Sequence, residues 1–148
     1  MPGLILEHFV PYRMSIASNA VSDMIATAYE ALFGLRIPEW RLVAVLAEIG
    51  PATPQGVGAA TRMDKVTVSR AATALLERGL LVRQPHGSDR RSHLLALTDA
   101  GRVLYGEIGP KALALEAELL GGFAPAEIAG FMDMLERLQA AAERMGGR

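Results

Sequence analysis

The chain contains no cysteine among its 148 residues. This absence excludes disulfide bonds, thiolate metal sites and cysteine-based sensing of oxidants. The chain also lacks an apolar run long enough to span a bilayer. Residues 1–13 include a short apolar stretch, but they have neither a basic leader nor a small-residue cleavage site. We therefore expect a soluble cytoplasmic protein.

The motifs of the common enzyme classes are missing as well. There is no serine–histidine–aspartate spacing, no HExxH zinc motif, no Walker loop and no pair of carboxylates placed for acid–base chemistry. His8 is far from the other two histidines in the sequence, whereas His86 and His93 bracket Asp89 and could approach it to bind a metal ion. Ordinary solvated histidines are the simpler interpretation. We expect no enzyme activity, no cofactor and no metal.

The chain does have enough apolar material for a core, and its charge is unevenly distributed. Hydrophobic residues make up 51% and charged residues 21%, which indicates one compact domain or a small domain with helical extensions. The net charge is −1, yet residues 62–93 hold seven basic residues against three acidic ones. The basic residues are Arg62, Lys65, Arg70, Arg78, Arg83, Arg90 and Arg91. Such a concentration is typical of a nucleic-acid interface, with chance clustering of surface arginines as the alternative.

A short amphipathic helix is expected from residue 65 to about residue 78. Asp64 can cap its free amides, and Gly79 can adopt the left-handed conformation that ends it. The inward apolar stripe comprises Val68, Ala71, Ala72, Leu75 and Leu76. The residues left facing outward are Lys65, Thr67, Ser69, Arg70 and Thr73. These side chains suit DNA, because they offer cations for phosphate, hydroxyls for base edges and an arginine that can bind guanine through two hydrogen bonds.

A β-hairpin is expected directly after this helix. Two strand-like runs, residues 80–84 and 93–97, flank the segment Pro-His-Gly-Ser-Asp-Arg-Arg-Ser, which is rich in turn-forming residues. The projecting tip would carry Arg90 and Arg91 beside Asp89. A helix followed by a basic hairpin favours one element for the major groove and a second for the minor groove, where arginine is attracted by the deep negative potential.

Further helices are expected on both sides of this region. The stretch 12–35 has two adjacent apolar stripes, which favours contact with a second subunit, with burial in its own domain as the alternative. The stripes are Ile16, Ala20, Met24, Thr27, Ala31, Leu35 and Val21, Ile25, Ala28, Leu32. Other helices are expected at 38–49, 54–61, 99–120 and from 125 onward, with a kink or break at Gly109–Pro110. Their expected inward residues are Trp40, Val43, Leu46, Ile49, Val57, Ala60, Leu104, Ile108, Leu115, Leu119, Ile128, Phe131, Leu135, Leu138 and Ala142.

Short motifs between residues 67 and 101 carry a resemblance to a known family. Asp89-x-Arg91 is followed by Leu97-Thr98 and then by Gly101, and upstream Thr67-Val68-Ser69-Arg70 precedes Leu75-Leu76-Glu77-Arg78-Gly79-Leu80. These motifs resemble the wing and the recognition helix of the MarR family of winged-helix transcriptional regulators, whose element order covers nearly the whole chain. The resemblance implies a mainly α fold with a small β-hairpin wing. A winged helix-turn-helix DNA-binding domain at 37–99 would be flanked by helical dimerisation regions at 1–36 and 100–148.

The resemblance also implies a function, a sequence-specific transcriptional regulator that binds double-stranded DNA. It would act as a homodimer, as a repressor, on a pseudo-palindromic operator. Lys65 would hold a phosphate, Thr67 and Arg70 would read bases, and Ser69 would either contact the groove or bond its own backbone. In the wing, either Arg90 or Arg91 would enter the minor groove, and Asp89 would orient Arg91. Thr98 and Gly101 would be structural, as a helix cap and a tight packing point.

Regulators of this family usually respond to a small molecule, bound between the dimerisation helices and the winged-helix lobe. The residues of this chain that the resemblance places there are His8, Tyr12, Arg13, Trp40 and Arg41. A cation beside aromatic groups would suit an aromatic acid. Trp40 could instead belong to the core, and Arg13 could pair with a neighbouring acid. For the chain as a whole, a winged helix that binds proteins without binding DNA is the alternative, and a small enzyme has no support in the sequence.

Overall fold

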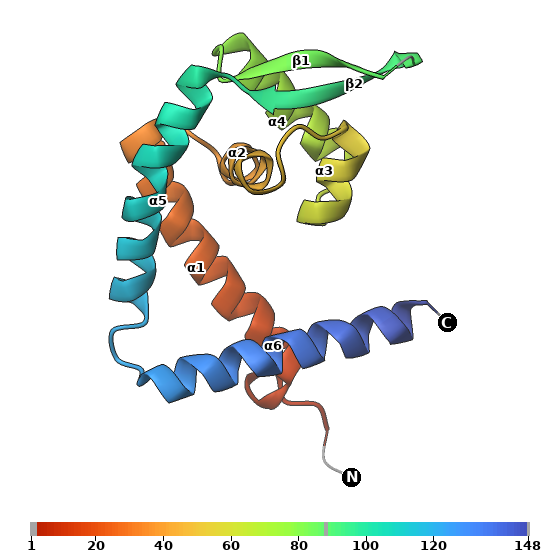
Figure 1. The fold of residues 1–148 in the computed structure, drawn as a ribbon. Helices are drawn as coiled ribbons and strands as arrows, with labels where there is room; N and C mark the ends of the chain where they lie inside the picture. Colours follow the sequence, from red (N-terminus) through yellow and green to blue (C-terminus); the bar gives the residue numbers. More distant parts are fainter. Residues whose placement is uncertain (1–2, 88, 148) are drawn as a thin grey trace. The chain divides into compact units, whose positions relative to one another are not determined.

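The structure, a computed structural model, describes residues 3–87 and 89–147, and residues 89–92 by their backbone alone. The described part is mainly helical with one two-stranded antiparallel sheet (Figure 1), as predicted. Its elements are the 3-10 turn η1 (Leu6–His8), α1 (Val10–Phe33), α2 (Ile37–Ile49), α3 (Pro54–Thr61), α4 (Lys65–Glu77), β1 (Leu81–His86), β2 (Asp89–Leu97), α5 (Asp99–Leu119) and α6 (Pro125–Gly146). The chain divides into two compact units, Met1–Gly109 and Pro110–Arg148.

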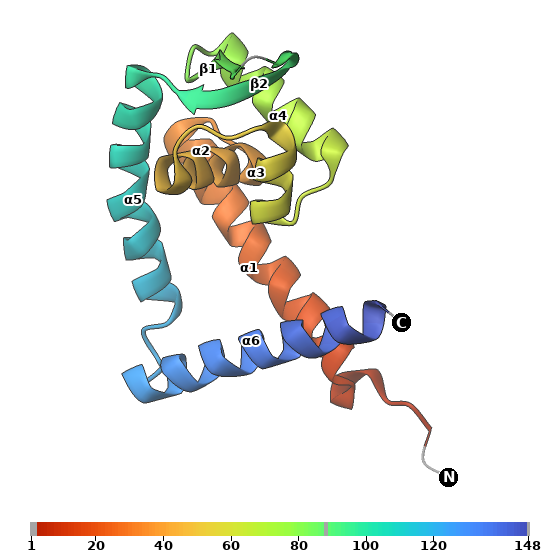
Figure 2. The same ribbon diagram turned by 45° about the vertical axis from the view of Figure 1, so that its right-hand side comes forward.

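Helix α2 lies at the centre of the first unit, and Figures 1 and 2 both show α3 and α4 beside it. It contacts α1, α3, α4 and β2. Leu42, Val43 and Leu46 of α2 are buried. The rest of the core consists of Tyr29, Phe33, Leu35, Val57, Val68, Ala71, Ala72, Leu75, Leu80, Leu81, Leu95, Ala96, Leu97 and Ile108. The other elements of this unit are therefore positioned by burying apolar side chains against or around one helix.

Helix α1 buries side chains outside the two apolar stripes expected for residues 12–35, of which Leu35, just after the helix, is also buried. Its buried residues are Tyr29 and Phe33, which belong to neither predicted stripe, whereas every residue from Val10 to Ala20 is exposed. The two aromatic rings lie edge to face, 6.0 Å apart, and the Tyr29 ring also meets the ring of Trp40 at 5.3 Å. Only the C-terminal part of α1 thus packs into the core of this unit. Burial raises the pKa of the Tyr29 hydroxyl above its usual value.

Six residues predicted to point inward are exposed instead: Ile49, Ala60, Leu119, Phe131, Leu138 and Ala142. In α2 the buried face is centred on Leu42, which the sequence analysis missed, so Ile49 at the end of the helix is 56% exposed. In α3, Val57 alone is buried, because a helix of eight residues presents only about two turns to its neighbours.

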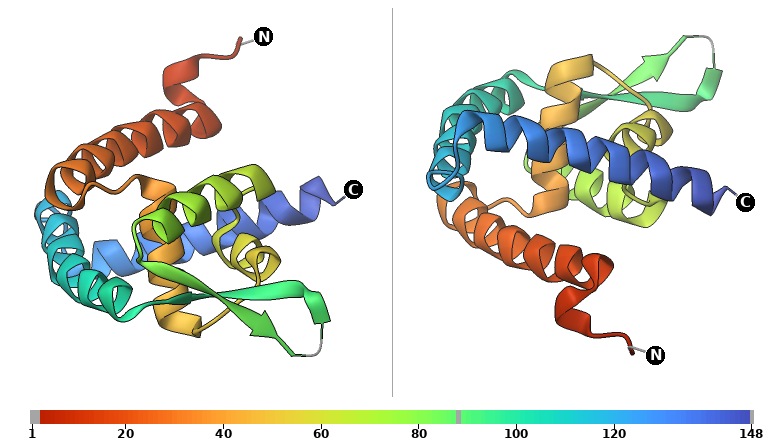
Figure 3. Two further views of the ribbon diagram at one scale, coloured as in Figure 1. Left: turned by 90° about the horizontal axis from the view of Figure 1, so that it is seen from above. Right: turned by 90° about the horizontal axis from the view of Figure 1, so that it is seen from below.

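The hairpin is longer than predicted. β1 and β2 pair from Leu81 opposite Leu97 to His86 opposite Asp89, so most of the segment expected as a turn-rich tip belongs to the strands. Gly87 has a φ of 59° and supplies a left-handed turn residue. The strands reach past α3 and α4 in Figures 1 and 3.

The base of the hairpin is attached to the link between α2 and α3. The amide of Ala52 donates to the carbonyl oxygen of Leu95 at 3.1 Å, and the amide of Leu95 donates to that of Ala52 at 2.8 Å. Leu95 itself is buried. These two hydrogen bonds fix where the hairpin leaves the core, so the direction of the hairpin does not depend on the turn between its strands.

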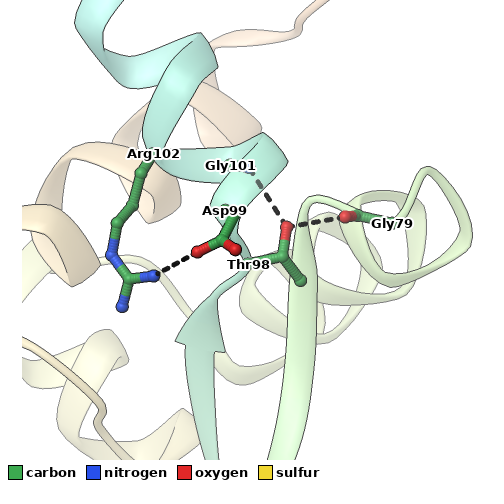
Figure 4. A network of polar contacts seen from close by, with 5 residues as sticks. All are labelled: Gly79, Thr98, Asp99, Gly101 and Arg102. Atoms are coloured by element: carbon green, nitrogen blue, oxygen red, sulfur yellow. Dashed lines mark hydrogen bonds and ion pairs between the residues drawn. The ribbon is translucent and has the colours of Figure 1, made fainter.

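A polar junction joins the end of the hairpin to the turn that follows α4 (Figure 4). The Thr98 hydroxyl donates to the carbonyl oxygen of Gly79 at 2.7 Å and accepts from the amide of Gly101 at 3.1 Å. The amide of Thr98 donates to the carbonyl oxygen of Leu80 at 3.1 Å. A Cβ on Gly101 would collide with that same Leu80 oxygen. Thr98 as a cap and Gly101 as a tight packing point are both confirmed.

The second unit consists of the later part of α5 and of α6. Of the kink or break expected at Gly109–Pro110, the break is absent, because helix α5 runs unbroken through this dipeptide. The boundary between the two units falls at the same place. The start of α6 is held by Glu127, whose carboxylate accepts from the amide of Ala124 at 2.9 Å. Many large apolar side chains of this unit are exposed in the single chain: Leu113, Leu119, Phe123, Phe131, Met132, Met134, Leu138 and Met145. Phe131 and Leu138 were predicted to point inward.

None of the helices that the structure describes is both long enough and apolar enough to cross a membrane.

Replacing Gly101 by alanine should lower the free energy of unfolding by about 1–3 kcal/mol or more, because the added Cβ can be accommodated only by moving backbone. Gly106→Ala is the matched control on the same helix, since a Cβ there meets nothing within 4 Å. That variant should be more stable than the parent by about 0.5–1 kcal/mol. Urea unfolding followed by circular dichroism measures both. Equal effects of the two substitutions would contradict the tight approach at residue 101.

Candidate nucleic-acid interface

Helix α4 begins at the cap that the sequence predicts. The carboxylate of Asp64 accepts from the amide of Thr67 at 2.7 Å. This backbone bond, together with a second hydrogen bond from the Thr67 side chain, holds the pKa of the Asp64 carboxyl below its usual value of 3.8. At the other end, Gly79 follows with a φ of 72°, also as predicted. Local signals at both ends thus define a helix of 13 residues.

One face of α4 is buried and the opposite face is open. Val68, Ala71, Ala72 and Leu75 are buried, which confirms four members of the predicted stripe, and the fifth, Leu76, is half-buried. The exposed polar residues of the helix are Lys65, Ser69, Arg70, Thr73 and Glu77. Thr67 is half-buried and bonded to the cap. Val66, which was not singled out from the sequence, is 59% exposed.

Helix α3 and the turn after it complete a helix-turn-helix arrangement. The Thr53 side chain caps α3 by accepting from the amide of Gly56 at 3.0 Å. At the turn, the Thr61 hydroxyl donates to the carbonyl oxygen of Val57 at 2.8 Å and accepts from the amide of Met63 at 3.3 Å. Arg62 adopts the left-handed conformation between the two helices, with a φ of 61°. These contacts set the angle at which α4 leaves α3.

The wing brings together the backbone of the predicted tip residues. Asp89, Arg90 and Arg91 belong to β2, and Asp89 lies opposite His86 in the register. Their side chains lie outside the described part of the structure, so the pairing of Asp89 with Arg91 and the choice between the two arginines stay predictions. Among the side chains that are described, no group of three histidine or acidic residues is placed to hold a metal ion.

Arg78 has a role that the charge count does not reveal. Its guanidinium donates to the carbonyl oxygens of Gly34 at 3.1 Å and Phe33 at 3.3 Å, at the C-terminal end of α1. A cation is favourable there because the last carbonyl groups of a helix carry partial negative charge. Arg78 therefore joins the end of α4 to the end of α1, and its guanidinium is engaged in hydrogen bonds within the chain.

The five residues predicted to bind a ligand form two separate groups in one chain. His8, Tyr12 and Arg13 are exposed, in η1 and the first turns of α1. Trp40 is half-buried on α2 beside the exposed Arg41, and it packs against Tyr29. Tyr12 and Tyr29 are both on α1, and their 17-residue separation corresponds to about 25 Å along a helix. One chain alone therefore does not bring the five together.

A shallow hollow of about 410 Å³ lies elsewhere in the first unit, between α2, β2 and the start of α5. Arg102 and Tyr105 supply its polar lining, and the remaining walls are apolar. None of the five predicted ligand residues lines it. The sequence offered no signal for this hollow, because the residues from the end of α2 are about 45 positions away in the chain from those of β2 and α5.

Comparison with known proteins shows that this region is similar to one family of regulators. A model of the MarR family matches residues 33–92, which contain α2, α3, α4, β1 and the first part of β2. A Bacillus subtilis (strain 168) protein described as an uncharacterized HTH-type transcriptional regulator, YwoH, is 35% identical over 91 residues. The aligned part is 62% of this chain and 66% of that protein, just under two thirds of its length. Over this region the chain is similar to the MarR family of transcriptional regulators.

Two solved structures show the same fold. A MarR/EmrR family transcriptional regulator from Acinetobacter sp. ADP1 is 26% identical, with a TM-score of 0.87 over 95% of this chain and 99% of that one. BpsR of Bordetella bronchiseptica, whose DNA binding is regulated by 6-hydroxynicotinic acid, is 24% identical, with a TM-score of 0.86 over 93% and 98% of the two chains. In fold the chain is thus a winged helix-turn-helix protein, similar to these regulators.

Replacing Asp64 by alanine should lower the melting temperature at neutral pH, and the deficit should shrink in acid. Because folding lowers the pKa of this carboxyl, its contribution to stability is present above the usual value of 3.8 and is lost as the pH falls through the lowered one. Thermal unfolding of both chains at about pH 7 and about pH 3 measures the change.

Asp64→Asn is the control for this experiment, because asparagine caps helices about as well as aspartate but does not titrate. It should remain close to the parent at neutral pH. A deficit of the alanine variant that is the same at both pH values would show that the charge of Asp64 contributes nothing.

Proposed function

We propose that this protein is a MarR-family transcriptional regulator that acts in the cytoplasm as a homodimeric repressor and occupies a pseudo-palindromic operator. The proposal rests on the open face of α4, which lies opposite the buried stripe on the second helix of the helix-turn-helix and is followed in the chain by a basic wing. In such folds the second helix enters the major groove with its N-terminal residues towards the bases. The exposed Arg70 and Ser69 lie in the first two turns of α4, where that geometry needs them.

Each predicted DNA contact has a role in this proposal. Lys65 holds a phosphate at the start of α4, and Arg70 binds a guanine edge. Ser69 donates to the groove. Thr67 contributes from the flank of the helix, since its amide and side chain are engaged by Asp64.

The wing contributes a second contact, in the minor groove. Asp89 orients Arg91, and either Arg91 or Arg90 inserts where the groove is narrow. The hairpin reaches past α3 and α4 (Figures 1 and 3), which supports a contact to DNA beyond the groove that α4 occupies.

Two copies of the chain form the dimer through the helical regions 1–36 and 100–148. In the single chain the apolar side chains at both ends are open to solvent, and exposed apolar surface on this scale marks an interface. Near the N-terminus these are Leu4, Ile5, Leu6, Phe9, Val10, Met14 and Ile16. A two-fold axis between the copies would place the two α4 helices on half-sites about 10 base pairs apart.

A small aromatic acid releases the repressor from DNA in this proposal. The regulation of BpsR by 6-hydroxynicotinic acid supports this class of ligand. His8, Tyr12, Arg13, Trp40 and Arg41 are the proposed binding residues. Because the first three lie about 25 Å along α1 from the Tyr29–Trp40 contact, a pocket that uses both groups takes them from different copies of the dimer.

Fluorescence anisotropy tests the function directly, with a labelled duplex from the DNA upstream of the protein's own gene. Specific binding should be tighter than binding to a random duplex, should fall steeply with salt, and should weaken when an aromatic acid such as 6-hydroxynicotinic acid is added. Arg91→Ala should weaken binding and reduce the salt slope by about one unit per chain. Arg137→Ala, an exposed arginine on α6, is the control and should leave the slope unchanged.

Two outcomes would count against the proposal. Absence of any DNA binding, combined with salt-insensitive binding to a protein, would favour the alternative of a protein-interaction module. A monomer in analytical ultracentrifugation at the concentrations that bind DNA would rule out the two-fold arrangement.

Arg70→Ala should relax base preference, at a cost of about 1–3 kcal/mol on the specific site and less on random DNA. The reason is that a bidentate contact to guanine is lost only where guanine is present. Arg102→Ala is the matched control, an exposed arginine on α5 that pairs with Asp99. If Arg70→Ala weakens specific and random binding equally, Arg70 contacts phosphate and does not read a base.

A further inference from the structure

The open face of α4 has a centre that the sequence pattern alone did not locate. The four buried residues of the helix define its inward direction. Successive residues are rotated by about 100°, so the line opposite that direction runs through Val66, Arg70, Thr73 and Glu77. Lys65 and Thr67 lie roughly a quarter of a turn to either side of this line.

Val66 is the apolar member of this line. Its residue is 59% exposed, and it is the one large apolar residue of α4 with an exposed surface. A single exposed apolar side chain is common on proteins and means little by its exposure alone. The position is what carries information, because Val66 is the second residue of the helix and helix-turn-helix proteins contact base edges with the N-terminal residues of this helix.

Among the residues in the first turn of α4, Val66 lies at the centre of the open face. Thr67 is bonded to Asp64 through its amide and its side chain, and it is half-buried. Arg70 follows Val66 by four residues and lies on the same side, one turn further along. With this spacing, Val66 can contact one base pair while Arg70 contacts a nearby one.

The isopropyl group of Val66 cannot donate or accept a hydrogen bond, which limits what it can recognise. The only apolar group that the base pairs present in the major groove is the 5-methyl of thymine. Valine is also stiff in a helix, with one strongly preferred rotamer, so it loses little side-chain freedom on contact. We infer that Val66 at the centre of the open face of α4 reads the methyl group of one thymine in each half-site. The inference rests on the proposed function, since it needs α4 in the major groove.

The test replaces thymines by deoxyuridine, which differs only by lacking the methyl group. The operator is first selected from a random duplex pool with the full chain, and each thymine of one half-site is then replaced in turn. At one position the replacement should weaken binding by the parent about fourfold, the value expected for one buried methyl group. Val66→Ala should bind the thymine and uracil duplexes equally at that position.

Val103→Ala is the matched control, because Val103 is a helical valine exposed to 63% on α5. It should keep the fourfold preference for thymine. If no thymine position matters to the parent, or if Val66→Ala keeps the preference, the inference is wrong while sequence-specific binding still upholds the proposed function. If the selection yields no specific duplex at all, both fall together.

Discussion

The burial of one face of α4 against α2 and α3 is the constraint on which the rest depends. Val68 and Leu75 are almost fully removed from solvent, beside a core that includes Val43 and Val57. Burying such a side chain is worth about 1.5–3 kcal/mol, whereas an exposed polar contact contributes about 0–1 kcal/mol. The rotation of α4 about its own axis is therefore set by its inward side. Its outward side then follows from geometry, and so does the set of side chains available to a ligand as large as DNA.

Polar contacts at the ends of the helices fix those positions of the chain that the burial of apolar side chains does not determine. Asp64 holds the start of α4, and Arg78 joins its end to the last carbonyls of α1. The Thr98 hydroxyl links the turn after α4 to the first turn of α5. Three helices and the hairpin thus meet around one short stretch of chain.

The parts that could be predicted from the sequence are those with local signals. The cap at Asp64, the left-handed Gly79 and the stripe of α4 coincide in one helix, and the structure agrees with all of them. The inward faces of α1 and α2 were partly wrong because these helices are apolar on more than one side, so periodicity does not choose between faces. Burial of Tyr29 depends on Trp40, a partner from another helix. Val66 was missed because the outward residues of this helix were chosen for their polar side chains, and valine is apolar.

The composition of the open face of α4 suggests which part of the protein provides affinity for DNA and which part provides sequence specificity. Its central line offers one cation, Arg70, and ends at Glu77, an acid that DNA phosphates would repel. Contact by α4 is then limited to its first two or three turns, which also hold Lys65, Val66 and Thr73. Two cations per helix give little of the salt-dependent attraction that dominates DNA affinity. In a chain whose net charge is −1, the proposed function therefore assigns most of that attraction to the wing and its arginines, and the choice of sequence to α4.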